Sequence, residues 1–78
     1  MNNEQHQALE HACAALRHAC TYERPGLWWR LHIDDAAKTL QEAGLVEIGN
    51  QVEAIETPAE VAQAVLMLED INLPASDK

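Results

Sequence analysis

The four histidines and two cysteines are the residues of this 78-residue sequence whose side chains most readily bind metals or act as bases and nucleophiles. A helix chelates a metal through ligands three or four residues apart, and no pair among these six residues has that spacing. Cys13 and Cys20 are seven residues apart, as are His11 and His18. Neither Cys-x-x-Cys nor His-Glu-x-x-His occurs. The sequence therefore predicts no metal site and no cofactor.

Catalysis is also poorly supported by the positions of these residues. Cys13 and Cys20 fall on an alanine-rich helical stripe, which is typical of unreactive buried thiols. His32 and Asp35 are three residues apart and suit a hydrogen-bonded dyad, but such a pair is more often structural than catalytic. Because the sequence also has no glycine-rich phosphate loop, we expect a protein that is not an enzyme.

The two cysteines are expected to stay reduced. On one helix Cys13 and Cys20 are separated by a rise of roughly 10.5 Å, whereas a disulfide tolerates a Cα separation of up to about 7 Å. Residues 1–4 contain neither a basic segment nor an apolar run, so we predict no signal peptide, and no stretch has the length of a membrane span. These features indicate a cytoplasmic protein.

The charge of the chain is one-sided. Thirteen acids against five lysines and arginines give a net charge of −8, and residues 39–77 carry eight acids and no base. Direct binding to nucleic acid needs a basic surface, and an anionic membrane repels such a chain, so we expect neither as a partner. A basic protein surface is the natural complement. The alternative is that the acidity serves only solubility.

Helices are the elements predicted to position these residues. The segment 3–20 repeats apolar residues at the helical period and is rich in alanine, glutamine and leucine. A second helix is predicted over 26–43, with Gly44 placed like the glycine that ends a helix. Asp34 and Asp35 either lie inside this helix or begin a second piece after a kink.

The second half contains one ambiguous segment and one clear helix. Apolar residues in 46–56 recur at helical spacing, but Gly49-Asn50 also suits the turn of a β-hairpin over 45–55. The helix is favoured because the hairpin would mix apolar and charged side chains on each face. Thr57-Pro58-Ala59-Glu60 is typical of a capping box that begins a helix over 58–72. We therefore predict a single all-α domain, 1–78, as a compact bundle of three to four short helices, with 1–2 and 74–78 frayed.

The adjacent Trp28 and Trp29 are the most specific feature for binding. Neighbouring residues on a helix point about 100° apart, so one tryptophan faces outward when the other faces the core. Trp29 shares a stripe with Ile33 and Leu40, which leaves Trp28 to form an exposed patch with Arg30, a composition enriched in binding hot spots. The alternative is that both tryptophans pack internally.

The acids of the second half complete the predicted partner-binding surface. Glu53, Glu56 and Glu60 follow one another in helical steps, with Glu47 one or two turns away. Carboxylates at such spacing are able to imitate the phosphates of a nucleic acid. We therefore assign partner binding to Trp28, Arg30, Glu47, Glu53, Glu56 and Glu60.

The size, the one-sided charge and the lack of catalytic motifs favour a small inhibitor. Phages and mobile elements direct small acidic proteins of this kind against host defence complexes, and such a protein would dock on a basic, nucleic-acid-binding host protein as a nucleic-acid mimic. The alternative is a self-associating structural or adaptor module with no nucleic-acid-related target. In that case the helices 3–20 and 58–72 would pair across a homodimer interface.

Overall fold

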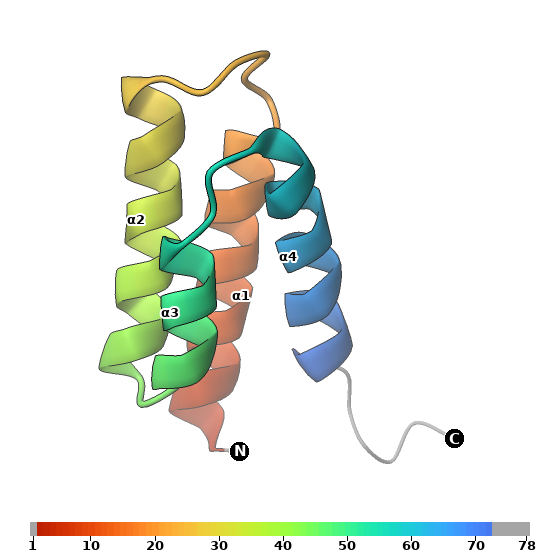
Figure 1. Cartoon of the computed structure of the whole chain (residues 1–78). Helices are drawn as coiled ribbons and strands as arrows, with labels where there is room; N and C mark the ends of the chain where they lie inside the picture. The colour runs from red at the N-terminus through yellow and green to blue at the C-terminus, as the bar shows by residue number, and fades with distance from the viewer. Residues whose placement is uncertain (1, 73–78) are drawn as a thin grey trace.

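Four helices make up the part of the chain that a computed structural model describes, residues 2–72 (Figure 1). They are α1 (Asn3–Ala19), α2 (Leu27–Glu42), α3 (Val46–Glu53) and α4 (Pro58–Asn72), and no strand occurs among these residues. The predicted all-α bundle is therefore confirmed. The tail expected to fray, 74–78, lies outside the described residues.

The N-terminus of α1 is capped by Asn2. Asn2 was expected to fray, but its side chain accepts a hydrogen bond from the Gln5 N–H at 2.8 Å, and its own N–H donates to Gln5 Oε1 at 3.3 Å. This reciprocal pair satisfies two N–H groups that a helix start otherwise leaves free. Asparagine followed by glutamine three residues later thus forms a capping box, and the fraying expected for residues 1–2 stays a prediction.

α2 is one continuous helix, so Asp34 and Asp35 lie inside it rather than at a kink. It ends in a Schellman motif around Gly44, whose φ of 92° lies in the left-handed region that favours glycine. The Leu45 N–H donates to the Leu40 carbonyl at 2.9 Å, and the Gly44 N–H donates to the Gln41 carbonyl at 3.1 Å. This tight turn directs α3 back along α2.

α3 replaces the hairpin that was the less favoured alternative for 45–55, and that alternative is wrong. Helical winding places Gly49 and Val52 together against the rest of the bundle, and both are buried. Gly49 lies so close to α2 that a Cβ on it would meet the Ala37 carbonyl oxygen at 2.9 Å. A hairpin would have exposed Val52 or buried an acid.

α4 begins at the predicted capping box. The Glu60 N–H donates to Thr57 Oγ1 at 3.3 Å, and the Thr57 N–H donates to Glu60 Oε1 at 3.0 Å. α4 packs on α1, α1 packs on α2, and α2 packs on α3, so α1 and α2 form the centre of the bundle (Figure 1). Among residues 2–72, no helix combines the length and the apolar character needed to cross a membrane.

One apolar core joins the four helices. Alanines on α1 and α2 let these two helices approach closely, and larger side chains from all four helices fill the space between them. The fully buried large side chains are Leu9, Leu16, Ile33, Leu40, Val52, Val61 and Leu68.

Candidate partner-binding surfaces

The two adjacent tryptophans have opposite environments. Trp29 is 3% exposed and belongs to the core, whereas Trp28 is 65% exposed. The alternative in which both tryptophans pack internally is therefore wrong. The indole N–H of Trp29 has no hydrogen-bond partner within the described residues, so Trp29 contributes to the core through its apolar surface alone.

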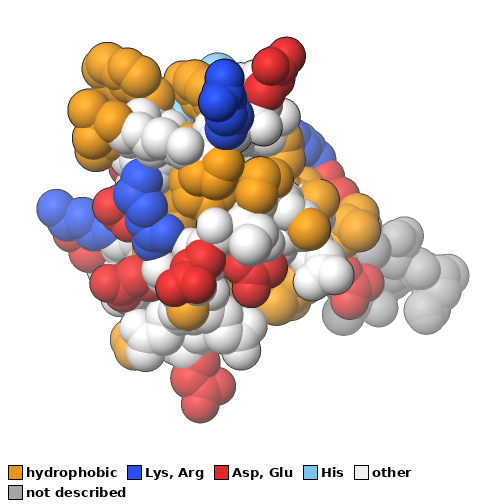
Figure 2. Space-filling view, turned by 45° about the horizontal axis from the view of Figure 1, so that its top comes forward, with side chains coloured by type: hydrophobic (Ala, Val, Ile, Leu, Met, Phe, Trp, Pro, Cys, Tyr) orange, Lys and Arg blue, Asp and Glu red, His pale blue; other side chains and the backbone are white. Residues whose placement is uncertain are grey.

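Trp28 is part of a small apolar surface that points away from the core. Leu27 is 71% exposed and Leu31 is 46% exposed. Residues three and four apart are neighbours on a helix, so these three side chains lie together. We call Leu27, Trp28 and Leu31 the outer face of α2. Figure 2 shows a group of hydrophobic side chains at the upper left of the molecule, where α2 begins.

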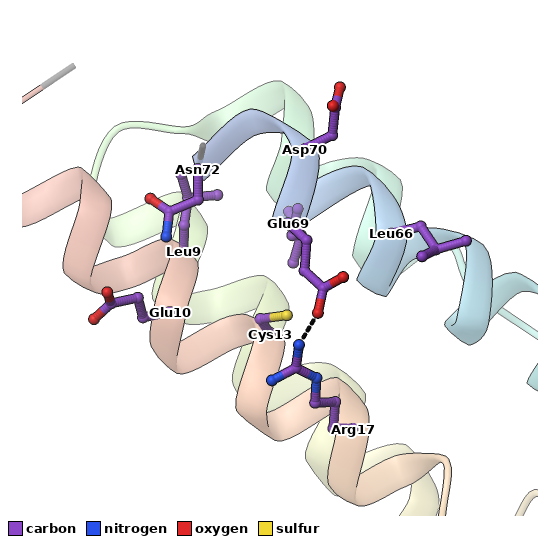
Figure 3. A pocket seen from close by; sticks show the side chains of 9 residues that line it. Leu9, Glu10, Cys13, Arg17, Leu66, Glu69, Asp70 and Asn72 are labelled. Atoms are coloured by element: carbon purple, nitrogen blue, oxygen red, sulfur yellow. Dashed lines mark ion pairs between the residues drawn. The ribbon is translucent and has the colours of Figure 1, made fainter. Parts of the chain in front are cut away.

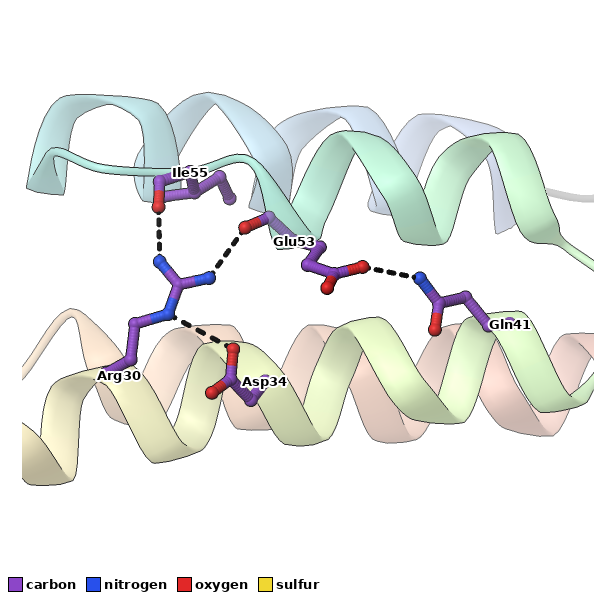
Figure 4. Close-up of polar contacts among 5 residues, drawn as sticks. All are labelled: Arg30, Asp34, Gln41, Glu53 and Ile55. Carbon is purple, nitrogen blue, oxygen red and sulfur yellow. Dashed lines mark hydrogen bonds and ion pairs between the residues drawn. The ribbon is translucent and has the colours of Figure 1, made fainter.

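Arg30 does not belong to this surface, although the sequence analysis had grouped it with Trp28. Its guanidinium donates through Nη1 to the Ile55 carbonyl at 2.5 Å and through Nη2 to the Glu53 carbonyl at 2.6 Å (Figure 4). Its Nε donates to Asp34 at 3.1 Å. Residues two positions apart on a helix point about 200° away from each other, so Trp28 and Arg30 point to nearly opposite sides of α2. Arg30 is a clamp that holds the end of α3 on α2.

Three of the predicted acids meet at the connection from α3 to α4. Glu53, Glu56 and Glu60 are all exposed, and we call them the acidic edge. The Glu53 carboxylate accepts a hydrogen bond from the side chain of Gln41 at 2.9 Å (Figure 4). Glu47 is exposed but belongs to the first turn of α3, and it points away from α2 because it precedes the packed Gly49 by two residues. The structure thus brings three of the four acids together.

Glu60 differs from the other acids of the edge because it completes the capping box. Its Oε1 accepts hydrogen bonds from the N–H groups of Glu56 at 2.8 Å and Thr57 at 3.0 Å. These two backbone hydrogen bonds, the Glu56 bond first, hold the pKa of the Glu60 carboxyl below its ordinary value, because they favour the ionised form. Glu60 therefore has a structural role, and Glu53 and Glu56 are the acids that the fold leaves more available.

A groove of about 570 Å³ lies between α1 and α4. Figure 3 shows the Arg17–Glu69 ion pair spanning it and the thiol of Cys13 beside it. Cys13 is 7% exposed, and its polar contact is a long one, 4.0 Å, to the Val65 carbonyl. Arg17 and the acids Glu10, Glu69 and Asp70 line the same groove, and Arg17 is paired with Glu69.

His11, His18 and His32 lie along the seam between α1 and α2, whereas His6 Nδ1 lies 2.7 Å from Asn72 Oδ1 at the end of α4. His11 Nε2 lies 3.0 Å from Asp35 Oδ2, so the predicted dyad of Asp35 with His32 is not formed. His32 instead stacks on His18, with ring centroids 5.5 Å apart, and its Nε2 lies 3.4 Å from the Tyr22 hydroxyl. No group of three His, Cys, Asp or Glu side chains within residues 2–72 is arranged to hold a metal ion.

Leu27 and Leu31 complete the apolar surface around Trp28, although neither was assigned to partner binding from the sequence. Leu31 is four residues from Leu27 and three from Trp28, so the three residues form a second apolar stripe beside the buried one. That stripe is a signal that the sequence contains.

Comparisons with known proteins identify no relative. No family model matches the chain, and neither the curated proteins nor the solved structures compared with it give a match. Function is therefore inferred from the residues and their geometry.

Proposed function

We propose that this protein is a non-enzymatic, protein-binding inhibitor whose acidic edge docks on a basic surface of a nucleic-acid-binding protein or complex. The observation that carries the proposal is the uncompensated charge of this edge. Ion pairs within residues 2–72 join Arg17 to Glu69, Arg30 to Asp34, Lys38 to Glu42, and His11 to Asp35. None of these pairs neutralises Glu53, Glu56 or Glu60.

Such an edge suits a basic partner for a simple electrostatic reason. Neighbouring exposed carboxylates make the local electrostatic potential more negative. This potential speeds the approach of a positively charged surface, and salt screens it. A surface that evolved to bind phosphates presents arginine and lysine side chains at which Glu53 and Glu56 are able to replace phosphate oxygens. The proposed inhibitor would thus exclude the nucleic acid from its partner.

The size and charge of the chain fit the small inhibitors that phages and mobile elements direct against host defence complexes. The proposal therefore includes a phage or mobile element as the source of this protein. Trp28 is not assigned to this contact, because it points away from the side of α2 on which α3 and the acidic edge lie. Glu47 extends the negative surface along α3.

The experiment is a pull-down from nuclease-treated lysate of the source cells with the wild type and two variants of equal net charge. Glu53→Lys/Glu56→Lys reverses two acids of the edge, and Glu10→Lys/Asp70→Lys reverses two acids beside the groove between α1 and α4. We expect a basic, nucleic-acid-binding protein to be retained by the wild type and by the second variant, and lost with the first. Circular dichroism spectra check that each variant is folded.

The captured protein is then tested directly with a labelled nucleic acid. The wild type is expected to displace the nucleic acid, with an apparent affinity that falls steeply as salt is added. Binding that resists both salt and the Glu53→Lys/Glu56→Lys change would contradict the proposal. Loss of binding with Glu10→Lys/Asp70→Lys alone would place the contact at the α1–α4 groove instead.

A further inference from the structure

The outer face of α2 has no role in the fold or in the proposed inhibition, and it is the largest apolar group of side chains that the described structure leaves exposed on one helix. Leu27, Trp28 and Leu31 are 71%, 65% and 46% exposed. An exposed tryptophan flanked by two leucines is typical of an interface, because clustered aromatic and aliphatic side chains lose unfavourable contact with water when a partner covers them. The charges beside this face indicate which kind of partner would cover it.

The charges around this face differ from those of the rest of the molecule. Residues 11–35 contain three acids, Glu23, Asp34 and Asp35, and three arginines, whereas the whole chain has 13 acids and five bases. A second acidic copy of the chain would be repelled at the acidic edge but not at this face. A strongly basic partner would find little here to attract it.

We propose that the outer face of α2 is the interface of a symmetric homodimer, in which two α2 helices pack antiparallel. A two-fold axis makes the same patch serve both copies, so a self-complementary set of residues is required. In this dimer Leu31 of one copy lies against Trp28 of the other. Because the two helices run in opposite directions, the turn before α2 in one copy then lies opposite residue 35 of the other. Arg24 lies in that turn, three residues before α2 begins, and we infer that it approaches Asp35 of the other copy, a pair that the symmetry makes twice.

Arg24 fits this role for a reason visible in the monomer. Of the four lysines and arginines within residues 2–72, Arg17, Arg30 and Lys38 each have an acidic partner in the chain, and Arg24 has none there. Asp35 is about half exposed and has only a surface contact with His11. Arg24 is therefore free to meet an acid across an interface. This interface differs from a pairing of α1 with α4 between copies, because those two helices pack on each other within one chain.

The three apolar side chains cover only a few hundred Å², which is below the roughly 800 Å² per partner of a standard interface, so the dimer is expected to be weak. Sedimentation equilibrium of the purified chain from roughly 1 µM to 1 mM covers the range of weak to moderate association. We expect reversible dimers in this range. Trp28→Ala should raise the dissociation constant at least about fivefold, as truncation of a hot spot does, and Leu27→Glu/Leu31→Glu should leave only monomers.

A charge swap makes the test specific to the antiparallel register. Arg24→Glu and Asp35→Arg should each weaken the dimer about twofold to tenfold, since each places like charges together twice. The double variant restores opposite charges and should recover the wild-type constant to within about threefold. Leu66→Glu, at a leucine of α4 that is 66% exposed, is the matched control and should leave the dimer intact.

Three results would overturn the proposal. The first is a monomer at every concentration. The second is a dimer that dissociates with Leu66→Glu but not with Leu27→Glu/Leu31→Glu. The third is a monomeric wild type whose contact with a captured protein is abolished by Trp28→Ala, which would assign the face to that protein. The dimer does not depend on the proposed inhibition, since sedimentation needs no partner.

Discussion

The outer face of α2 and the acidic edge are both exposed, but the fold depends on them to different degrees. Leu27, Trp28 and Leu31 form no side-chain hydrogen bond within residues 2–72 and contribute nothing to the buried core. At the acidic edge, by contrast, Glu60 caps α4, and the backbone of Glu53 is held by Arg30. Exposure alone therefore does not distinguish a binding surface from a structural one.

This difference also separates two kinds of evidence for function. An apolar side chain that the fold leaves exposed has a free-energy cost in water and no structural benefit, so a partner is the natural explanation. A carboxylate at the surface is well solvated, and its presence needs no partner. The case for the acidic edge rests on uncompensated charge, and that for the outer face of α2 on uncovered apolar area.

The largest expected effect distinguishes the inner and outer sides of α2. Ile33→Ala removes a fully buried side chain and should lower the free energy of unfolding by about 2–5 kcal/mol. Leu31→Ala, on the outer face, should change it by less than about 1 kcal/mol. Urea denaturation at low protein concentration, where dimers are absent, measures both.

Ile33→Val is the milder variant to measure if the Ile33→Ala protein does not fold. It deletes one methylene and should cost about 0.5–1.5 kcal/mol, which leaves the protein folded. If Leu31→Ala destabilised the monomer as strongly as Ile33→Ala, Leu31 would be part of the core, and the outer face of α2 would not be the free surface described here.

The second prediction concerns the close contact that places α3 and the acidic edge beside α2. A Cβ on Gly49 would lie 2.6 Å from Gln41 Cγ and 2.9 Å from the Ala37 carbonyl oxygen. Gly49→Ala gains about 1 kcal/mol of helix propensity, but overpacking costs about 1–3 kcal/mol. We expect a net destabilisation of about 1 kcal/mol, since the carbonyl oxygen is backbone and yields little.

Gly26→Ala is the control for this substitution. No atom lies within 4 Å of the position of its added Cβ, and Gly26 is extended, a conformation that alanine adopts. Its effect should stay within about 0.5 kcal/mol. A stabilised Gly49→Ala protein in chemical denaturation would show that α3 does not approach α2 as closely as the structure indicates.

These contacts show how far the sequence could predict the fold. The capping box at Thr57 and the glycine at position 44 are local signals, since the groups that they satisfy lie within a few residues, and both were predicted. A helix over 46–56 was favoured over a hairpin because the hairpin would mix apolar and charged side chains on each face. The close packing of Gly49 on Ala37 depends on two helices meeting in space, and no local pattern shows it.

The candidate site was less predictable for the same reason. Helical periodicity put Trp29 on the stripe of Ile33 and Leu40 and about 100° from Trp28, but it left open which tryptophan is exposed and whether both pack internally. The partners of Arg30 are the carbonyls of Ile55 and Glu53, more than 20 residues away. Every residue has a backbone carbonyl, so the sequence does not show which carbonyls an arginine will bind. Arg30, which stabilises the fold, was therefore predicted to bind a partner.

The third prediction tests the structural role of Arg30 against the free arginine Arg24. Arg30→Ala removes hydrogen bonds to two carbonyls and should destabilise the protein by about 1–2 kcal/mol. Arg30→Lys should recover little of this, because an ammonium cannot match the fork of a guanidinium toward two acceptors. Arg24→Ala should leave stability within about 0.5 kcal/mol. Thermal unfolding that shows equal effects at positions 24 and 30 would contradict the clamp.

The smallest expected effect separates the structural acid of the edge from a solvated one. The pKa of Glu60 is lowered in the folded state, first by the Glu56 N–H and then by the Thr57 N–H. A lowered pKa contributes stability that is fully present above the unfolded-state pKa and is lost as the pH falls through the folded-state pKa. Glu60→Gln keeps a capping side chain but cannot titrate, so its melting temperature should fall less than that of the wild type between pH 6 and pH 3, a range of about three units around the ordinary carboxyl pKa. Glu47→Gln, at an acid in the first turn of α3, is the control and should retain more of the wild-type acid dependence. If the two substitutions flatten the pH profile equally, the capping carboxylate of Glu60 contributes no more to the acid dependence of stability than Glu47 does, which would contradict the structural role of Glu60 at the start of α4.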